Sequence, residues 1–390
     1  MNKSIILSII FLFILSSGSQ MFLCIAKKQD VQNIFFEEKM LGIDANYVTS
    51  IKDFFFHWRY HFKKIDIYPF FHSRGINYLR LRIFIQDNGP DSLSYAINTA
   101  KLVQEQGMKC SVTLFMSSDW SDIGKQPAPM LWNTLYNYSN LSLEHKADII
   151  RNYTYNTTLS LLDNGIDADL YEIGNEIDYG FCGIFEENLT KRENISFMRN
   201  ATWEQMASLL NAGIKGVQAA DPTSQFILHI AHWWDYNFSA AFFTTMKDND
   251  IPLGYLGLSF YPSSGIFNIT QAYQGIGNGT LSQLLFQQTA EKLADTFGTP
   301  LIISEYAYPS TSLILGPFGS FTHPVNGYPL TKQGQKTWLH HFLQWAADHP
   351  FIAGTFYFSP EFHRIIWSPF SLFTFFGNAK PAVDVFKEFS

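Results

Sequence analysis

Cysteine is scarce in this chain, which has three in 390 residues. So few cysteines exclude a small domain held together by disulfides, and no Cys-x-x-Cys pair or Cys/His cluster predicts a structural metal. Cys24 lies near the start of the chain, so Cys110 and Cys182 remain, either as one disulfide or as two buried thiols. Cys110 falls in an apolar strand-like run, which favours the buried thiol. We expect neither a metal nor any other cofactor.

Charged residues are also few, at 16% of the chain, and no stretch is rich in Lys or Arg. The formal net charge of -7 argues against a polyanionic partner, and we expect no binding to nucleic acid. A glycine-rich phosphate loop is missing after the first predicted strand, which argues against a nucleotide-binding sheet.

The apolar run at residues 5–15 is short for a membrane span, follows Lys3 and precedes the polar residues 16–19. This pattern is typical of a cleaved secretory signal, with an uncleaved anchor extended through residues 21–26 as the alternative. Cleavage after Ser19 and cleavage after Ala26 both fit. We therefore predict a signal peptide at 1–26 and one folded domain at 27–390, with no stable membrane association once the signal is removed.

Asn-x-Ser/Thr triplets without a central proline occur ten times beyond the signal, and their number predicts an N-glycosylated protein that is secreted or sent to a lysosome-type compartment. The alternative is a coding bias toward Asn that leaves the triplets unused. The asparagines are Asn137, Asn140, Asn152, Asn156, Asn188, Asn194, Asn200, Asn237, Asn268 and Asn278.

Short apolar runs alternate with helical stretches along the domain, which predicts an α/β fold with a parallel sheet. Eight such units predict a (β/α)8 TIM barrel in a single domain, with a doubly wound open sheet as the alternative. The aromatic segment 51–68 is expected to be a helix that packs against the barrel. The expected strands are 42–47, 78–85, 108–116, 170–174, 226–231, 255–261, 301–305 and 352–358, and the clearest helices are 93–106, 143–163, 202–219, 281–297 and 332–349.

Two of the strand-like runs end in a glutamate, Glu176 after Ile-Gly-Asn and Glu305 after Leu-Ile-Ile-Ser. Catalytic groups of a (β/α)8 barrel lie at the carboxyl ends of its strands, so both carboxylates are expected at one mouth. Glycoside hydrolysis needs such a pair, one to protonate the leaving oxygen and one to act as base or nucleophile. The alternatives are that Glu176 caps the following helix and that Glu305 pairs with an arginine in the core.

Taken in order, several segments resemble the endo-β-1,4-galactanases, glycoside hydrolase family 53, of the clan A (β/α)8 retaining glycosidases. The resemblance covers nearly the whole chain after the signal. It implies a secreted, endo-acting hydrolase of β-1,4-galactosidic bonds in galactan or arabinogalactan that works by double displacement. The segments are Gly42–Asp44, Leu79–Phe84, Trp120–Asp122, Ile173–Ile177, Gly257–Pro262 and Ile302–Glu305.

The resemblance implies Glu176 as the general acid/base and Glu305 as the nucleophile. Asn175 would contact the sugar 2-hydroxyl, while Arg82 and Tyr261 would hold Glu305 ionised. Arg80 alternates with apolar residues on the same inward face as Arg82, and we expect it to form a structural ion pair deeper in the barrel. The further candidates for substrate binding are His229, Trp120, Trp233, Tyr308 and Phe358; for His229 a core position is an equal alternative, as loop packing is for Trp233.

Departures from the family fall around the sugar-binding floor. Thr113 and Phe115 stand where an acid and a His are usual, Tyr308 stands for Trp, and Phe358-Ser359-Pro360 stands for Trp-Glu-Pro. The alternatives are therefore a clan A glycosidase that acts on another β-linked polysaccharide, such as mannan or glucan, or a carbohydrate-binding barrel without turnover. In each case the expected partner is a polysaccharide and the expected state is a monomer.

Overall fold

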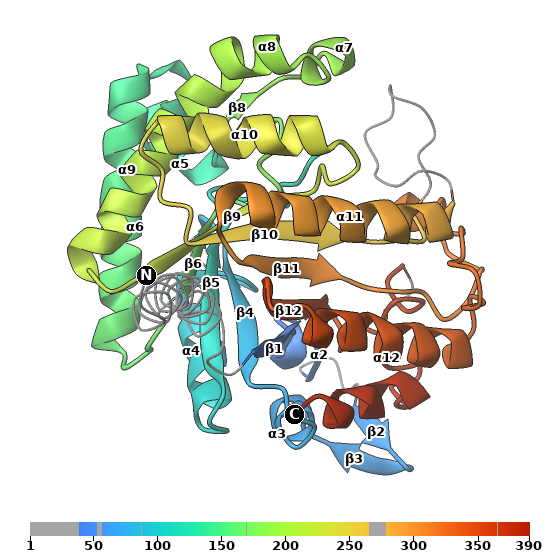
Figure 1. Cartoon of the computed structure of the whole chain (residues 1–390). Helices are drawn as coiled ribbons and strands as arrows, with labels where there is room; N and C mark the ends of the chain where they lie inside the picture. Colours follow the sequence, from blue (N-terminus) through green and yellow to red (C-terminus); the bar gives the residue numbers. More distant parts are fainter. Residues whose placement is uncertain (1–38, 53–56, 87, 169, 265–277, 365) are drawn as a thin grey trace, which may run out of the picture. The chain divides into compact units, whose positions relative to one another are not determined.

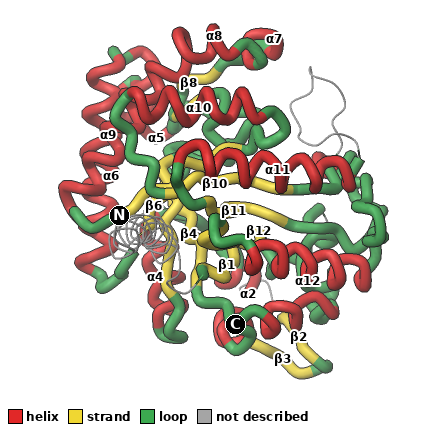
Figure 2. The backbone as a smooth tube through the Cα atoms, viewed as in Figure 1, coloured by secondary structure: helices red, strands yellow, loops and turns green. Residues whose placement is uncertain are grey.

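The computed structural model of the chain describes residues 39–52, 57–86, 88–168, 170–264, 278–364 and 366–390. The predicted signal peptide and the triplet at Asn268 lie outside these residues. Eight parallel strands close into a barrel (Figure 1; Figure 2) because β1 pairs with β12 on one side and with β4 on the other. The order around the barrel is β1 (Met40–Asp44), β12 (Ile352–Phe358), β11 (Leu301–Tyr306), β10 (Tyr255–Phe260), β9 (Gln225–Ile230), β6 (Leu170–Ile173), β5 (Lys109–Leu114) and β4 (Tyr78–Ile83). The (β/α)8 prediction is confirmed, and each predicted strand is present within three residues of its expected ends.

Helices surround the barrel, and the five that were predicted are confirmed. Polar caps fix several of their starts: the hydroxyls of Ser92, Ser142 and Thr331 each accept a hydrogen bond from a backbone N–H in the first turn. The helices are α4 (Leu93–Gln104), α6 (Leu143–Asp163), α9 (Glu204–Ala220), α11 (Gly279–Phe297) and α12 (Lys332–Asp348), with α10 (Tyr236–Asp248) in addition.

Five apolar side chains fill the barrel interior below the site: Tyr78, Leu170, Ile227, Ile302 and Phe356. Gly42 makes room for the Phe356 ring, because a Cβ on Gly42 would lie 2.3 Å from that ring. Strand side chains alternate, so the residues two places further along these strands also point inward. Those residues include Asp44, Arg80, Glu172 and His229, all buried, and they form a polar layer above the apolar one.

The aromatic segment 51–68 is not a helix in its described part. It begins in the last two residues of α2 (Val48–Lys52), continues in a hairpin of β2 (Trp58–Tyr60) and β3 (Lys63–Ile65), and ends in the first two residues of α3 (Ile67–His72). Tertiary contacts decide this: the indole N–H of Trp58 donates to the carbonyl of Glu361 at 2.9 Å, and the backbone of Arg59 exchanges hydrogen bonds with Gly377 and Ala379. An isolated aromatic run carries no signal of such distant partners, so the helix prediction was wrong.

Cys110 and Cys182 are both buried, and they do not form a disulfide with each other. Cys182 contacts the hydroxyl of Tyr138 at 3.2 Å. No helix among the described residues is long and apolar enough to cross a membrane.

Candidate active site

Glu176 and Glu305 are brought into one buried site. Glu305 lies in β11 and Glu176 follows β6, with 3% and 5% of their surfaces exposed. Each carboxyl contacts inward-facing residues of other strands, so neither serves as a simple helix cap.

The chain turns sharply at Glu176, which has a φ of +44° in the left-handed region. A non-glycine residue is strained in that region and needs neighbours that hold it there. The side-chain amide of Gln126 supplies such contacts, because its Nε2 donates to the carbonyls of Asn175 at 2.8 Å and Glu176 at 3.1 Å. Gln126 was not among the predicted site residues, and its position in a long loop gives no pattern from which sequence could identify it.

Arg80 is the central cation of the site. Its Nη1 donates to Asp44 Oδ2 and to Glu305 Oε1, each at 2.9 Å. Its Nη2 donates to Asn175 Oδ1 at 2.7 Å and also to Glu172. The side-chain Nδ2 of Asn175 donates a hydrogen bond to the carbonyl of Ser121 at 3.0 Å.

The arginine that holds Glu305 is therefore Arg80, and the expectation of Arg82 in that role was wrong. Arg82 lies one pleat nearer the mouth, and its Nε lies 3.5 Å from Asp44 and 3.8 Å from Asp91. Both arginines point inward, as alternation predicts. Which of them reaches β11 depends on the stagger of strands around the closed barrel, which strand periodicity does not reveal.

The two glutamates have different electrostatic surroundings. Burial raises the pKa of Glu305, but Arg80, His229 and a 2.8 Å hydrogen bond from the Tyr261 hydroxyl to Oε2 oppose the rise. Burial also raises the pKa of Glu176, there reinforced by the charges of Glu305 and Asp122, and carries it well above the usual range. No cation contacts Glu176 among the described residues, so Glu176 holds a proton more readily than Glu305, and Glu305 is the carboxyl that more readily carries the negative charge.

Glu172 is a member of the site that the sequence reasoning missed. Burial by itself would raise its pKa, but Arg80 and His229 outweigh burial and hold the pKa at about 2. His229 Nδ1 lies 3.1 Å from Glu172 Oε1, and its Nε2 lies 2.8 Å from Ser259 Oγ. Ser259 is also close enough to Glu176 to oppose, in part, the rise that burial causes in the Glu176 pKa. The alternation that places Arg80 inward would have placed Glu172 inward too, two residues after Leu170.

Aromatic rings surround Arg82 at the mouth. Its guanidinium lies 4.7 Å from the ring centre of Tyr47, 5.3 Å from that of Trp120 and 5.7 Å from that of Phe358. Trp120 is half-buried and its indole N–H donates to Asp122 at 3.1 Å. Phe115, one of the departures from the family, packs on Trp120 with ring centres 5.0 Å apart.

Trp233 and Tyr308 do not reach this site. Trp233 is 1% exposed and packs between strand and helix against Phe260 and Phe286. Tyr308 is fully buried, stacks on Trp338 and donates its hydroxyl hydrogen bond to the carbonyl of Tyr328. Loop and helix packing, the alternative weighed for Trp233, accounts for both residues.

Among the residues that the structure covers, no group of three or more His, Cys, Asp or Glu side chains is arranged to hold a metal ion.

Known proteins share the sequence pattern and the fold of this chain. The profile of Glycosyl hydrolase family 53 matches residues 40–386. The chain is 24% identical over 336 residues to the endo-beta-1,4-galactanase of Bacillus subtilis strain 168, which covers 79% of this chain and 69% of that protein. It is 25% identical over 274 residues to the arabinogalactan endo-beta-1,4-galactanase A of Emericella nidulans, with 68% and 69% covered. Among solved structures, the GH53 catalytic domain of Ignisphaera aggregans superposes with a TM-score of 0.73 at 21% identity, over 90% of this chain and 95% of that one.

Proposed function

This chain belongs to glycosyl hydrolase family 53 and is a glycoside hydrolase, and from that premise we propose that it is an endo-acting β-1,4-galactanase that retains anomeric configuration. The observation that carries the proposal is the electrostatic asymmetry of its two buried glutamates. Glu305 is held by Arg80 and Tyr261, whereas Glu176 has carboxylates for neighbours. A retaining glycosidase needs this arrangement of one ionised and one protonated carboxyl.

The proposed reaction has two displacements. Glu305 attacks the anomeric carbon while Glu176 gives its proton to the leaving glycosidic oxygen, which breaks the bond to the departing chain. The glycosyl ester on Glu305 is then attacked by a water that Glu176 deprotonates, and this frees the sugar with net retention. Asn175 has one amide hydrogen on Ser121, which leaves the other for the sugar 2-hydroxyl.

Galactan or arabinogalactan is the proposed substrate, supported by the two relatives that are named as galactanases. Mannan or glucan is the second candidate. This second candidate is favoured by Phe115, which packs an apolar ring on Trp120 where the family usually has a histidine, and by Ser359, which follows β12 directly. Trp120 and Phe358 are the proposed ring-stacking surfaces.

The test is reducing-end release from galactan, arabinogalactan, mannan, xylan and β-glucan by the mature protein, E176Q and E305Q. We expect galactan cleavage to fall roughly 10²- to 10⁴-fold in E176Q, and about 10⁴-fold or more in E305Q. An activated aryl glycoside, whose leaving group needs no acid, should restore the first step in E176Q alone. NMR of the first-formed anomer checks retention.

Other outcomes reassign the function. Cleavage of another polymer would leave the proposed mechanism in place and would identify that polymer as the substrate. No turnover on any polymer by folded protein, together with no covalent label on Glu305 from a glycosidase inactivator, would favour the carbohydrate-binding barrel.

We also propose that the chain is a secreted or lysosomal-type glycoprotein. All nine triplet asparagines in the described residues are exposed, whereas four of the other eleven are, namely Asn88, Asn98, Asn164 and Asn326. A coding bias toward Asn would not sort the triplets to the surface, so the contrast supports used glycosylation sites. Mass spectrometry before and after enzymatic removal of N-glycans from the secreted protein tests this proposal, and an unchanged mass would refute it.

A further inference from the structure

The turn of the β2–β3 hairpin is strained. Tyr60 pairs with Lys63, so the turn has two residues, His61 and Phe62, with φ of +48° and +65°. Two-residue turns with positive φ at both positions strongly favour Asn and Gly. A bulky residue pays a conformational cost there, and such outliers are retained where a function needs the side chain.

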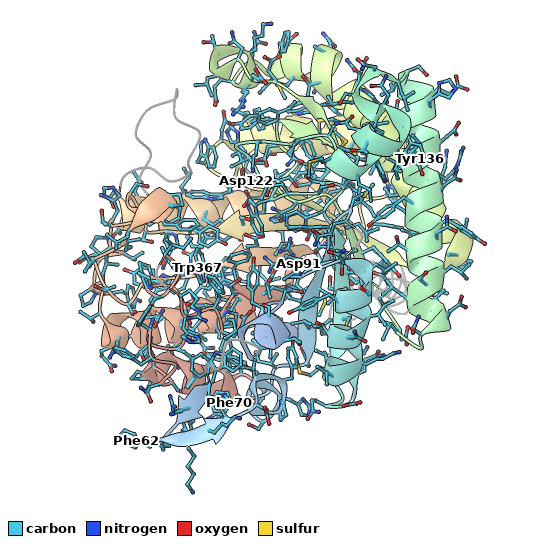
Figure 3. The ribbon with its side chains drawn as sticks, turned by 180° about the vertical axis from the view of Figure 1, so that it is seen from behind. Phe62, Phe70, Asp91, Asp122, Tyr136 and Trp367 are labelled. Atoms are coloured by element: carbon cyan, nitrogen blue, oxygen red, sulfur yellow. The ribbon has the colours of Figure 1, made fainter. Side chains whose placement is uncertain are left out.

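The fold does not bury the side chain of Phe62. It is 93% exposed, the most exposed of the large hydrophobic side chains in the described domain. Figure 3 shows it at the outer tip of the hairpin, directed away from the barrel. Burial against an apolar partner is what such a side chain lacks.

The hairpin concentrates positive charge in an acidic protein. Residues 57–66 contain Arg59, Lys63 and Lys64 against one Asp, whereas the whole chain has a net charge of -7. Lys63 and Lys64 are both exposed. The nearby carboxylate of Asp384 does not neutralise them, because it pairs with Arg74 at 3.1 Å and Lys387 at 2.9 Å.

More apolar surface lies beside β2. The backbone of Arg59 bonds Gly377 at 2.8 Å, and its Nη1 donates to the carbonyl of Phe376 at 3.4 Å. Phe375 and Phe376 are 40% and 74% exposed. The hairpin and this loop therefore present exposed phenylalanine rings together with cations.

We propose that the β2–β3 hairpin docks reversibly on an anionic lipid surface. Phe62 enters the boundary between headgroups and acyl chains, while Lys63 and Lys64 pair with the headgroup charges. Sugar-binding surfaces instead present exposed Trp or Tyr rings, whereas Tyr60 beside this turn is half-buried and its hydroxyl donates to Asp384 at 3.0 Å. The negative net charge of the whole chain argues against a polyanionic partner in general. Docking of one hairpin, however, depends on the local charge of that hairpin, which is positive. Such docking is peripheral and adds no stable membrane anchor.

The test is co-sedimentation of the full domain with phosphatidylcholine vesicles, with and without phosphatidylserine. We expect binding only with phosphatidylserine, and weaker binding at high salt. F62S should lose about tenfold in partitioning, from the apolar area of one ring. K63E/K64E should lose roughly fivefold or more for each charge reversed.

Matched variants separate docking from folding. M130S removes another exposed hydrophobic side chain, 71% exposed on α5 (Met130–Tyr136), and K215E/K247E reverses two exposed charges on α9 and α10; both should bind like the parent protein. H61N/F62G gives the turn the residues its φ values favour, so it should keep or raise the melting temperature while losing vesicle binding.

Equal binding by F62S, or equal binding to vesicles without phosphatidylserine, would overturn the proposal. So would binding to soluble polygalacturonate that F62S leaves unchanged, because that result would make the partner an acidic polysaccharide. Hydrolysis of soluble polysaccharide should be unchanged in F62S, so failure of docking is distinguishable from failure of the proposed activity.

Discussion

Residues of one type differ in this protein because their surroundings differ. Glu176 and Glu305 are both buried, yet only Glu305 receives hydrogen bonds from Arg80 and Tyr261. Glu172, the penultimate residue of β6, is held ionised by the same arginine. Neighbouring donors, more than burial, therefore divide the buried carboxyls into charged and protonated ones.

Removal of the Tyr261 hydroxyl should move the acid side of the pH profile. Its hydrogen bond favours ionised Glu305, so its loss in Y261F raises the pKa of Glu305. Activity that needs the ionised form then begins at higher pH, and kcat/KM on the acid side falls about tenfold or more, the worth of one hydrogen bond to a charged group. The measurement is kcat/KM against pH.

Tyr308 offers the control for that experiment. Its hydroxyl bonds the carbonyl of Tyr328, away from the glutamates. Y308F should lower the melting temperature and leave both sides of the profile in place, and the same shift in both variants would contradict the assignment.

At the scale of elements, the loop after β5 completes the carboxyl end of β6. Glu176 sits on a strained turn, and Gln126, from the loop between β5 and α5, binds the two carbonyls beside that strain. The barrel strands position the site, but a loop from the neighbouring strand fixes the direction of its acid.

Truncation of Gln126 should therefore affect catalysis more than folding. In Q126A the carbonyls of Asn175 and Glu176 lose their donor, and Glu176 is free to relax from its positive φ. We expect kcat to fall at least about tenfold, with a loss of about 1–3 kcal/mol in unfolding free energy. The measurements are kcat on the substrate identified by the polysaccharide panel and chemical unfolding.

Gln335, a buried glutamine of α12, also donates its side-chain amide to backbone carbonyls, but away from the glutamates. Its Nε2 donates to the carbonyls of Tyr308 at 2.8 Å and Phe370 at 3.1 Å. Q335A should cost comparable stability and leave the kcat of the folded enzyme unchanged. An equal loss of kcat in both variants would mean that Gln126 acts only through general stability.

At the scale of the whole molecule, buried carboxyls tie stability to pH. Burial raises the pKa of Glu361 to about 8, although the Tyr47 N–H donates to its Oε1 at 2.9 Å. Between the usual pKa of glutamate, about 4.5, and this value, the folded state binds a proton that the unfolded state has lost. Stability therefore falls as pH rises through that window and levels off above it.

Replacement of Glu361 by Gln should remove this loss. The amide oxygen can still accept from Tyr47, and no ionisation occurs. We expect the difference in unfolding free energy between pH 5 and pH 9 to shrink in E361Q by up to about 4 kcal/mol. Urea unfolding at a series of pH values measures it.

Glu172 provides a control of opposite sign. Its pKa of about 2 lies below the usual value, so its contribution to stability is present above pH 4.5 and is lost as pH falls toward 2. E172Q should change the acid side of the stability curve and keep the alkaline loss. Parallel curves for the parent protein and E361Q would contradict the role assigned to Glu361.

The sequence by itself determined the eight barrel strands, the helices between them and the two glutamates at strand ends. These features are local, because side-chain alternation, helix caps and strand boundaries depend on neighbouring residues in the chain. The tertiary structure decided which arginine meets Glu305, since Arg80 and Arg82 share one inward face and only the closed barrel's stagger distinguishes them. It also decided that Trp233 and Tyr308 are buried and that Phe62 is exposed at a hairpin tip. Burial of an aromatic ring depends on segments far away in the chain, and no local pattern specifies which of those segments will cover it.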